Sequence, residues 1–167
     1  IILKKFIVKF LKKLNKLKLA FISGATKGIG RSTAITFANA GWDLILLSRK
    51  MDLLEKLKSE LLTTNSKISL VKCDLSNPLG IENCVGEAIE KYGCPSVLIN
   101  NAGCAFNESL VEMDFKHWEQ TIQTNLTSVF QICSATIPQM RKNGGLVINV
   151  SSHASYNAFP QWGAYCI

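Results

Sequence analysis

Residues 17–30 read LKLAFISGATKGIG, and this stretch decides the fold. The apolar run at residues 17–23 predicts a buried β-strand, and the glycine-rich GATKGIG that follows predicts a tight turn. Residues 31–40, RSTAITFANA, predict a helix that ends at Gly41. A strand, a glycine turn and a helix in this order make the first unit of a βα repeat.

The same alternation of strand and helix continues along the chain. Further strands are predicted at residues 43–48, 68–73, 96–100 and 146–150, and helices at 51–62, 78–93 and 114–142. Pro78 is expected in the first turn of its helix, and Asp114 is expected to cap the last one. This pattern predicts an α/β fold: a Rossmann-like, doubly wound parallel sheet in three α/β/α layers, incomplete at its C-terminus.

The glycine turn has the features of a phosphate site. Its glycines permit a tight turn and a close approach of the backbone to a pyrophosphate. The helix that follows offers unpaired N–H groups and a positive dipole end to an anion. A loop that only needs positive φ angles is the alternative. The predicted dinucleotide contacts are Gly24, Thr26, Lys27, Gly28, Ile29 and Gly30.

The end of the second strand indicates which dinucleotide binds. Many dinucleotide folds carry an acid there for the ribose 2′-hydroxyl, whereas this chain has Ser48 and Arg49. Arg49 and Lys27 are suited to pair with a 2′-phosphate, which favours NADP(H) over NAD(H). The alternative is that Arg49 and Lys50 are solvated loop charges.

The spacing of SGATKGIG resembles the TGxxxGxG turn of the short-chain dehydrogenase/reductase family, with Ser23 in place of the usual threonine. Further motifs similar to those of the family follow in order from Leu17 to the last residue. They are Cys73-Asp74-Leu75, Asn100-Asn101-Ala102-Gly103, Asn125, Val150-Ser151-Ser152 and Tyr165. The resemblance implies that the protein reduces a carbonyl to an alcohol with NADPH, or catalyses the reverse reaction.

The resemblance also implies roles for individual residues. Asp74 and Leu75 would contact the adenine side of the cofactor. Asn101, Ala102 and Gly103 would stabilise the sheet and line the cofactor. The catalytic residues would be Asn125, Ser152 and Tyr165, with Ser152 preferred to Ser151 because it lies thirteen residues before the tyrosine.

Reduction of a carbonyl builds negative charge on its oxygen, which needs a proton and a hydrogen-bond donor. Tyr165 would give the proton, Ser152 would hold the oxygen, and Asn125 would orient a water. A phenol with a pKa of about 10 is a poor base, so the family tunes it with a lysine four residues on. The sequence stops at Ile167, before that position. We therefore expect this chain alone to have negligible turnover.

The charge and composition of the chain limit the classes of molecule that it is expected to bind. The formal net charge is +7, and seven lysines lie within residues 1–18, so the remainder is balanced and no nucleic-acid face is predicted. Residues 1–16 are typical of a basic amphipathic leader, which could lie on a membrane surface or be non-native, and residues 17–167 are predicted to form the NADP-binding domain. The resemblance implies a small-molecule substrate and a homodimer or homotetramer. A non-catalytic dinucleotide-binding sensor or scaffold is the alternative function.

Cysteine and histidine usage favours an ordinary intracellular enzyme. The six cysteines are widely spaced without a CxxC pair, and His117 and His153 do not have metal-ligand spacing, so no metal site is predicted. No apolar run is long enough to span a membrane, and no signal-peptide pattern is present. We expect a cytoplasmic protein with reduced thiols; its substrate is not predicted by the sequence.

Overall fold

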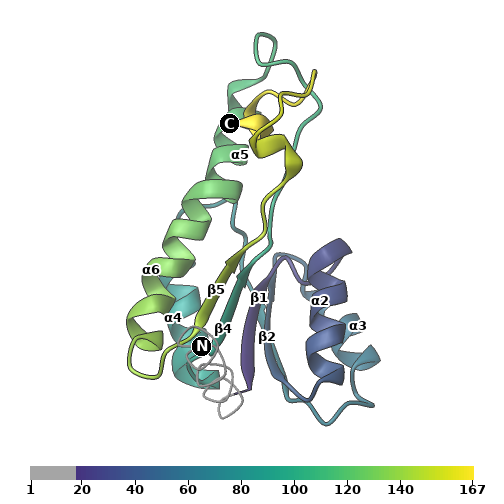
Figure 1. The fold of residues 1–167 in the computed structure, drawn as a ribbon, viewed down its shortest axis with the longest axis vertical. Helices are drawn as coiled ribbons and strands as arrows, with labels where there is room; N and C mark the ends of the chain where they lie inside the picture. Colours follow the sequence, from purple (N-terminus) through teal and green to yellow (C-terminus); the bar gives the residue numbers. More distant parts are fainter. Residues whose placement is uncertain (1–17) are drawn as a thin grey trace, which may run out of the picture.

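The computed structural model describes residues 18–167 and confirms the α/β class (Figure 1). The predicted leader, residues 1–16, lies outside the described residues. Five parallel strands form one sheet in the order β3-β2-β1-β4-β5. The strands are β1 (Leu19–Ser23), β2 (Asp43–Ser48), β3 (Ile68–Lys72), β4 (Val97–Asn100) and β5 (Leu146–Asn149).

Helices cover both faces of the sheet, as Figure 1 shows. They are α2 (Gly28–Asn39), α3 (Met51–Glu60), α4 (Ile81–Tyr92), α5 (Phe115–Ile122) and α6 (Ser128–Met140). Successive residues of a strand point to opposite faces, and β1 shows this directly. Ala20 and Ile22 pack in the core under α2 and α3, whereas Phe21 packs in the core under α4 and α6. The sheet is therefore doubly wound.

The start of α4 differs from the prediction. Pro78 was expected in its first turn, but α4 begins at Ile81, after Gly80 in the left-handed region at φ 84°. The side chain of Asn77 accepts a hydrogen bond from the Leu79 N–H at 3.0 Å. This turn around Pro78 competes with helix formation, so the helix starts only after it.

The last predicted helix, residues 114–142, contains an interruption. Asp114 caps it as predicted, because its carboxylate accepts the Lys116 N–H at 2.8 Å. A π-helical segment, Gln123–Thr127, then separates α5 from α6, and the helix ends at Met140. Such π segments are often found at functional sites, and Asn125 lies inside this one.

The buried face of α5 and α6 is unusually polar. Its buried residues are Thr121, Thr124, Ser128, Ile132, Thr136 and Met140. The Ser128 hydroxyl donates to the Thr124 carbonyl at 2.7 Å, so part of this polarity is satisfied within the helix. The large apolar side chains of Leu126 and Phe130 are instead 65% and 68% exposed.

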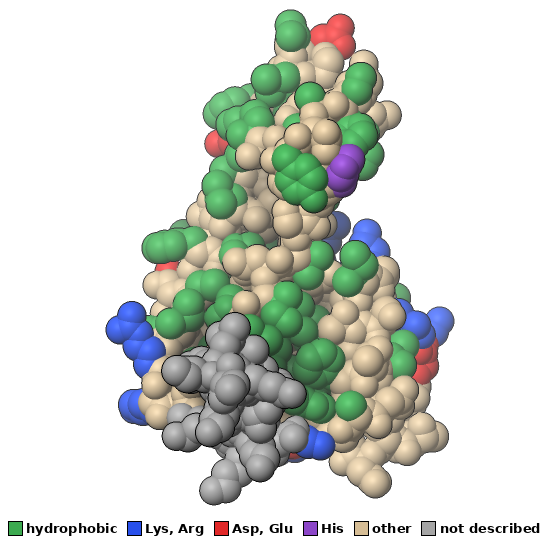
Figure 2. Space-filling model, viewed as in Figure 1, with side chains coloured by type: hydrophobic (Ala, Val, Ile, Leu, Met, Phe, Trp, Pro, Cys, Tyr) green, Lys and Arg blue, Asp and Glu red, His purple; other side chains and the backbone are tan. Residues whose placement is uncertain are grey.

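Strand β5 forms an open edge of the sheet. Leu146, Ile148 and Val150 along it are between 37% and 40% exposed. Figure 2 shows hydrophobic side chains on the face of the molecule that carries β5. More of them cover the upper part of the molecule in this view. An open edge with apolar side chains is a surface that proteins normally cover.

Candidate functional site

The site lies where strand order reverses, between β1 and β4. In open parallel sheets the crevice at the carboxyl ends of two such strands is the usual ligand site. β1 ends at Ser23 and β4 ends at Asn100, so the glycine turn and the Asn101-Ala102-Gly103 segment meet there.

Hydrogen bonds join the glycine turn to the segment after β4. The hydroxyl of Ser23, a residue only 1% exposed, accepts the N–H groups of Asn101 and Ala102, both at 3.1 Å. The Asn101 side-chain amide in turn donates to the carbonyls of Ser23 and Gly24, at 3.0 and 3.1 Å. On the other side, the Gly24 N–H donates to the Leu47 carbonyl at 2.9 Å. The turn is therefore fixed to both neighbouring strands before any ligand binds.

The three glycines of the turn have different roles. A Cβ on Gly24 would lie 2.8 Å from the Cα of Ala102, and one on Gly30 would overlap the Asn101 amide and the Gly24 carbonyl. Gly28 has φ 53° and no atom near its Cβ position within 4 Å. Gly24 and Gly30 thus permit internal packing, whereas Gly28 borders open space.

The N-terminus of α2 fits a phosphate group. Its first residue is Gly28, its N-cap Lys27 makes no side-chain capping bond, and its first turn holds no acidic residue. The helix dipole and the free N–H groups there are suited to an anion. Together with the open space at Gly28, these donors form a cradle of the kind predicted for a pyrophosphate.

The predicted ribose contacts lie beside this cradle. The hydroxyls of Thr26 and Ser48 are 3.3 Å apart, which joins the glycine turn to the end of β2. Lys27 and Arg49 are exposed, and within residues 18–167 neither forms a salt bridge. Within the described residues neither cation is paired with a carboxylate, although the charge of Arg49 acts on nearby Asp74. Ile29, in the same turn, is 64% exposed.

Asp74 lies just after β3, and its carboxylate accepts hydrogen bonds. Its carboxylate already accepts from the Ser76 hydroxyl at 2.7 Å and from the Ser76 N–H at 3.0 Å. Partial burial raises the pKa of Asp74, but these two bonds and the charge of Arg49 outweigh that effect and lower the pKa below its usual value. Asp74 is exposed and ionised at neutral pH, and Leu75 beside it is buried.

Asn125 lies against the segment after β4. Its side-chain amide donates to the Cys104 carbonyl and its oxygen accepts the Cys104 N–H, both at 2.8 Å. A Cβ on Gly103 would lie 3.4 Å from that oxygen. Asn125 therefore holds the loop that follows Gly103, and its role with a water stays a prediction.

Ser152 and Tyr165 lie in two neighbouring 3₁₀ turns. The Ser152 hydroxyl accepts the Ala154 N–H at 3.2 Å and caps the turn His153–Ser155. Tyr165 lies in the turn Ala164–Cys166, with its ring edge-on to Trp162 at 5.3 Å. The two turns pack on one another and the second packs on α5. Across residues 18–167, no hydrogen bond connects the three predicted catalytic side chains with one another.

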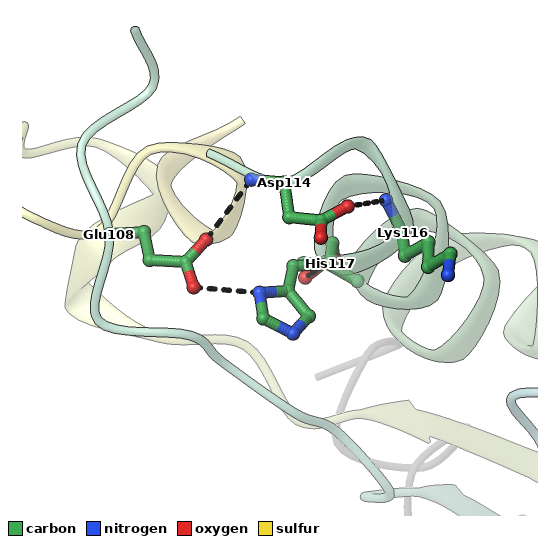
Figure 3. Close-up of polar contacts among 5 residues, drawn as sticks. Glu108, Asp114, Lys116 and His117 are labelled. Atoms are coloured by element: carbon green, nitrogen blue, oxygen red, sulfur yellow. Dashed lines mark hydrogen bonds and ion pairs between the residues drawn. The ribbon is translucent and has the colours of Figure 1, made fainter. Parts of the chain in front are cut away.

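Figure 3 shows a polar cluster that the sequence did not predict. The Glu108 carboxylate pairs with Nδ1 of His117 at 2.7 Å and accepts the Asp114 N–H at 3.4 Å. The His117 ring stacks on Phe106, with ring centroids 3.9 Å apart. The Glu108 carbonyl also accepts the Gly163 N–H at 3.2 Å. This loop residue therefore connects the start of α5 to the segment that carries Tyr165.

Residues 18–167 match the sequence profile of the family described as short chain dehydrogenase. The chain belongs to this family. A relative of this short-chain dehydrogenase chain is the 3beta-hydroxysteroid dehydrogenase of Mediterraneibacter gnavus, which is 34% identical over 149 residues. That match covers 89% of this chain and 54% of the relative. The resemblance inferred from the motifs is thereby confirmed.

Solved structures of two oxidoreductases share the fold. An alcohol dehydrogenase from Thermococcus sibiricus complexed with 5-hydroxy-NADP has a TM-score of 0.84 and 29% identity, and the match covers 89% of this chain and 64% of that chain. The L-sorbose reductase of Gluconobacter frateurii complexed with NADPH and L-sorbose has a TM-score of 0.84 and 26% identity, with 89% and 57% covered. The chain thus spans a little more than half the length of these proteins.

Within residues 18–167, no helix is long and apolar enough to cross a membrane. The same residues hold no group of three or more histidine, cysteine or acidic side chains arranged to bind a metal ion.

Replacing Ser23 by alanine should destabilise the chain by about 2 kcal/mol. The change removes the acceptor of two main-chain N–H groups in a nearly solvent-free position, and each unsatisfied group costs about 1–3 kcal/mol, partly relieved by relaxation. Urea unfolding followed by circular dichroism measures the loss. Ser23→Thr keeps the hydroxyl and serves as the control. Equal midpoints for Ser23→Ala and the unchanged chain would show that these bonds do not hold the turn.

Proposed function

We propose that the whole protein is an NADP(H)-dependent oxidoreductase that interconverts a carbonyl and an alcohol. The observation that carries the proposal is the uncapped N-terminus of α2, open at Gly28 and flanked by the exposed cations Lys27 and Arg49. The alcohol dehydrogenase and the sorbose reductase of similar fold, both solved with an NADP-type ligand, support the choice of cofactor.

Different residues of the site would bind different parts of the cofactor. The glycine turn and the first N–H groups of α2 would hold the pyrophosphate. Asp74 would accept a hydrogen bond from the adenine amino group, because its carboxylate is exposed and ionised. The segment Asn101–Gly103, fixed by Ser23, would line the cofactor near the reacting end.

Ser152 and Tyr165 would act on the carbonyl during its reduction. A bound NADPH would supply a hydride, and negative charge would grow on the substrate oxygen as that hydride is transferred. The Ser152 hydroxyl would donate a hydrogen bond to that oxygen, and the Tyr165 hydroxyl would give it a proton. Asn125 would keep the loop after Gly103 in position and orient a water that returns the proton.

Replacing Arg49 by alanine should weaken NADPH binding about tenfold and leave NADH binding unchanged. One charge-assisted hydrogen bond to the 2′-phosphate is worth about 1.5–3 kcal/mol, and solvent exposure reduces this to the lower end, close to tenfold. Fluorescence titration of the chain with each dinucleotide measures both affinities. Lys50→Ala, which removes the next exposed cation, is the control. An equal loss for NADPH and NADH would contradict a 2′-phosphate contact.

The assembly proposed for the whole protein is a homodimer or homotetramer that covers the exposed face of α5 and α6. Phe115 on α5, Leu126 in the π-helical segment and Phe130 on α6 are each about two-thirds exposed, between 65% and 68%. Monomeric proteins seldom leave a contiguous apolar patch of this kind open to water. The cytosol is the proposed location, because all six cysteines are free thiols.

A further inference from the structure

Two thiols lie together where β3 meets α4. Cys73 directly follows β3, and Cys84 lies in the first turns of α4. The Cys84 thiol is 3.7 Å from the carbonyl oxygen of Lys72, the residue before Cys73, and both cysteines pack against the same cluster of core residues. Both are half-buried against the core under α4. The proposed reaction uses neither of them.

We propose that Cys73 and Cys84 form a reversible disulfide that cross-links β3 to α4 beside Asp74. The oxidant is a low-molecular-weight disulfide such as oxidised glutathione. One protein thiolate attacks it and releases one small thiolate; the other protein thiolate then attacks the mixed disulfide and releases the second. The two protein thiols lose two protons and two electrons, and one small disulfide becomes two small thiols.

The surroundings of the pair set the rate of this exchange. Burial, together with the neighbouring Cys84 and Asp74, raises the pKa of Cys73 to about 12, and burial also raises the pKa of Cys84. Only the thiolate attacks a disulfide, so few molecules are reactive at neutral pH. The cross-link should therefore form slowly near neutrality and faster as the pH rises.

A disulfide here would act on the proposed adenine contact, so this consequence rests on the proposed function. A sulfur–sulfur bond is about 2.0 Å long, shorter than any contact between two thiols. We expect formation of this bond to draw Cys73 and the first turns of α4 closer together and so to shift Asp74, the residue after Cys73. We expect the affinity of the oxidised chain for NADPH to fall about threefold or more, which corresponds to about 0.65 kcal/mol or more.

The test is oxidation of the whole chain with excess oxidised glutathione at mildly alkaline pH, followed by alkylation of free thiols. Residues 73–91 form one tryptic peptide with a cleavable Glu82 between the two cysteines. The expected product is this peptide without alkyl groups and lighter by two hydrogens, whose halves stay joined after cleavage at Glu82 until a reductant is added. A peptide alkylated or glutathionylated at both cysteines would overturn the proposal.

Two variants and one binding measurement complete the test. Cys84→Ser should leave Cys73 without a protein partner, and Cys94→Ser, at another half-buried thiol, should still form the cross-link. NADPH titration of the reduced and oxidised chains then measures the consequence. A mapped disulfide with unchanged affinity overturns the effect on the adenine contact, whereas absence of NADPH binding in both forms counts against the proposed function and leaves the disulfide standing.

Discussion

Replacing Tyr165 by phenylalanine in the whole protein is expected to lower kcat for carbonyl reduction by about 100- to 10,000-fold, the usual contribution of a positioned general acid. The variant loses only the hydroxyl, and its ring can keep the edge-on contact with Trp162 at 5.3 Å. NADPH affinity and the unfolding midpoint should therefore stay unchanged. The rate is measured as the loss of NADPH absorbance with an accepted carbonyl substrate.

Tyr156 provides the control for this experiment. It lies in the same part of the chain, is 78% exposed, and has its ring edge-on to His153 at 5.4 Å. Tyr156→Phe removes the same hydroxyl from a position with no proposed part in the reaction, so its kcat should match that of the unchanged protein. If both variants had similar kcat values, Tyr165 would not be the acid, and a non-catalytic dinucleotide binder would become the better description.

Replacing Gly30 by alanine should destabilise the chain by about 3 kcal/mol, the upper end of the usual cost of overpacking, and remove measurable NADPH binding. The added Cβ would overlap the Gly24 carbonyl as well as the Asn101 amide. A flexible side chain can move aside, but the carbonyl belongs to the glycine turn. The turn must therefore shift, and with it the anion site at the N-terminus of α2.

Urea unfolding and NADPH titration of the chain measure both effects of the Gly30 change. Gly86→Ala is the matched control, because Gly86 lies inside α4 with no atom within 4 Å of its Cβ position. Alanine favours a helix over glycine by about 0.5–1 kcal/mol, so this variant should unfold at a slightly higher urea concentration. Equal midpoints for the two variants would show that the contact around Gly30 does not constrain the turn.

The strands and the glycine turn could be predicted because their signals are local. β2 covers residues Asp43–Ser48, as expected, since an apolar run bounded by polar residues indicates a buried strand. The glycines of the turn allow close contacts within the βα unit. They also allow close contacts with the segment after β4, the strand at which the order of strands in the sheet reverses. Asp114 was recognisable as a cap from its position just before the helix.

Features that depend on distant contacts could not be predicted. Leu126 and Phe130 follow helical spacing, yet they are exposed because α6 turns its small polar residues toward α4 and the sheet. The pairing of Glu108 with His117 depends on the path of a loop that carries no periodicity. Tyr165 could be recognised from its motif, but its 3₁₀ turn could not, because its packing on α5 is a tertiary contact.

The π-helical segment Gln123–Thr127 also divides the long helix into two parts, α5 and α6, that follow one another along the chain. Its wider turn takes up one extra residue, which changes the rotational phase between α5 and α6 by about 100°, the angle of one residue in an α-helix. α6 is thereby aligned with α4, and α5 with the turn that carries Tyr165. Deleting one residue from the segment would give a more regular helix and swing one of these alignments out of phase. A change in the length of this segment should therefore disturb the packing of the helix more than a single substitution at one of its exposed positions.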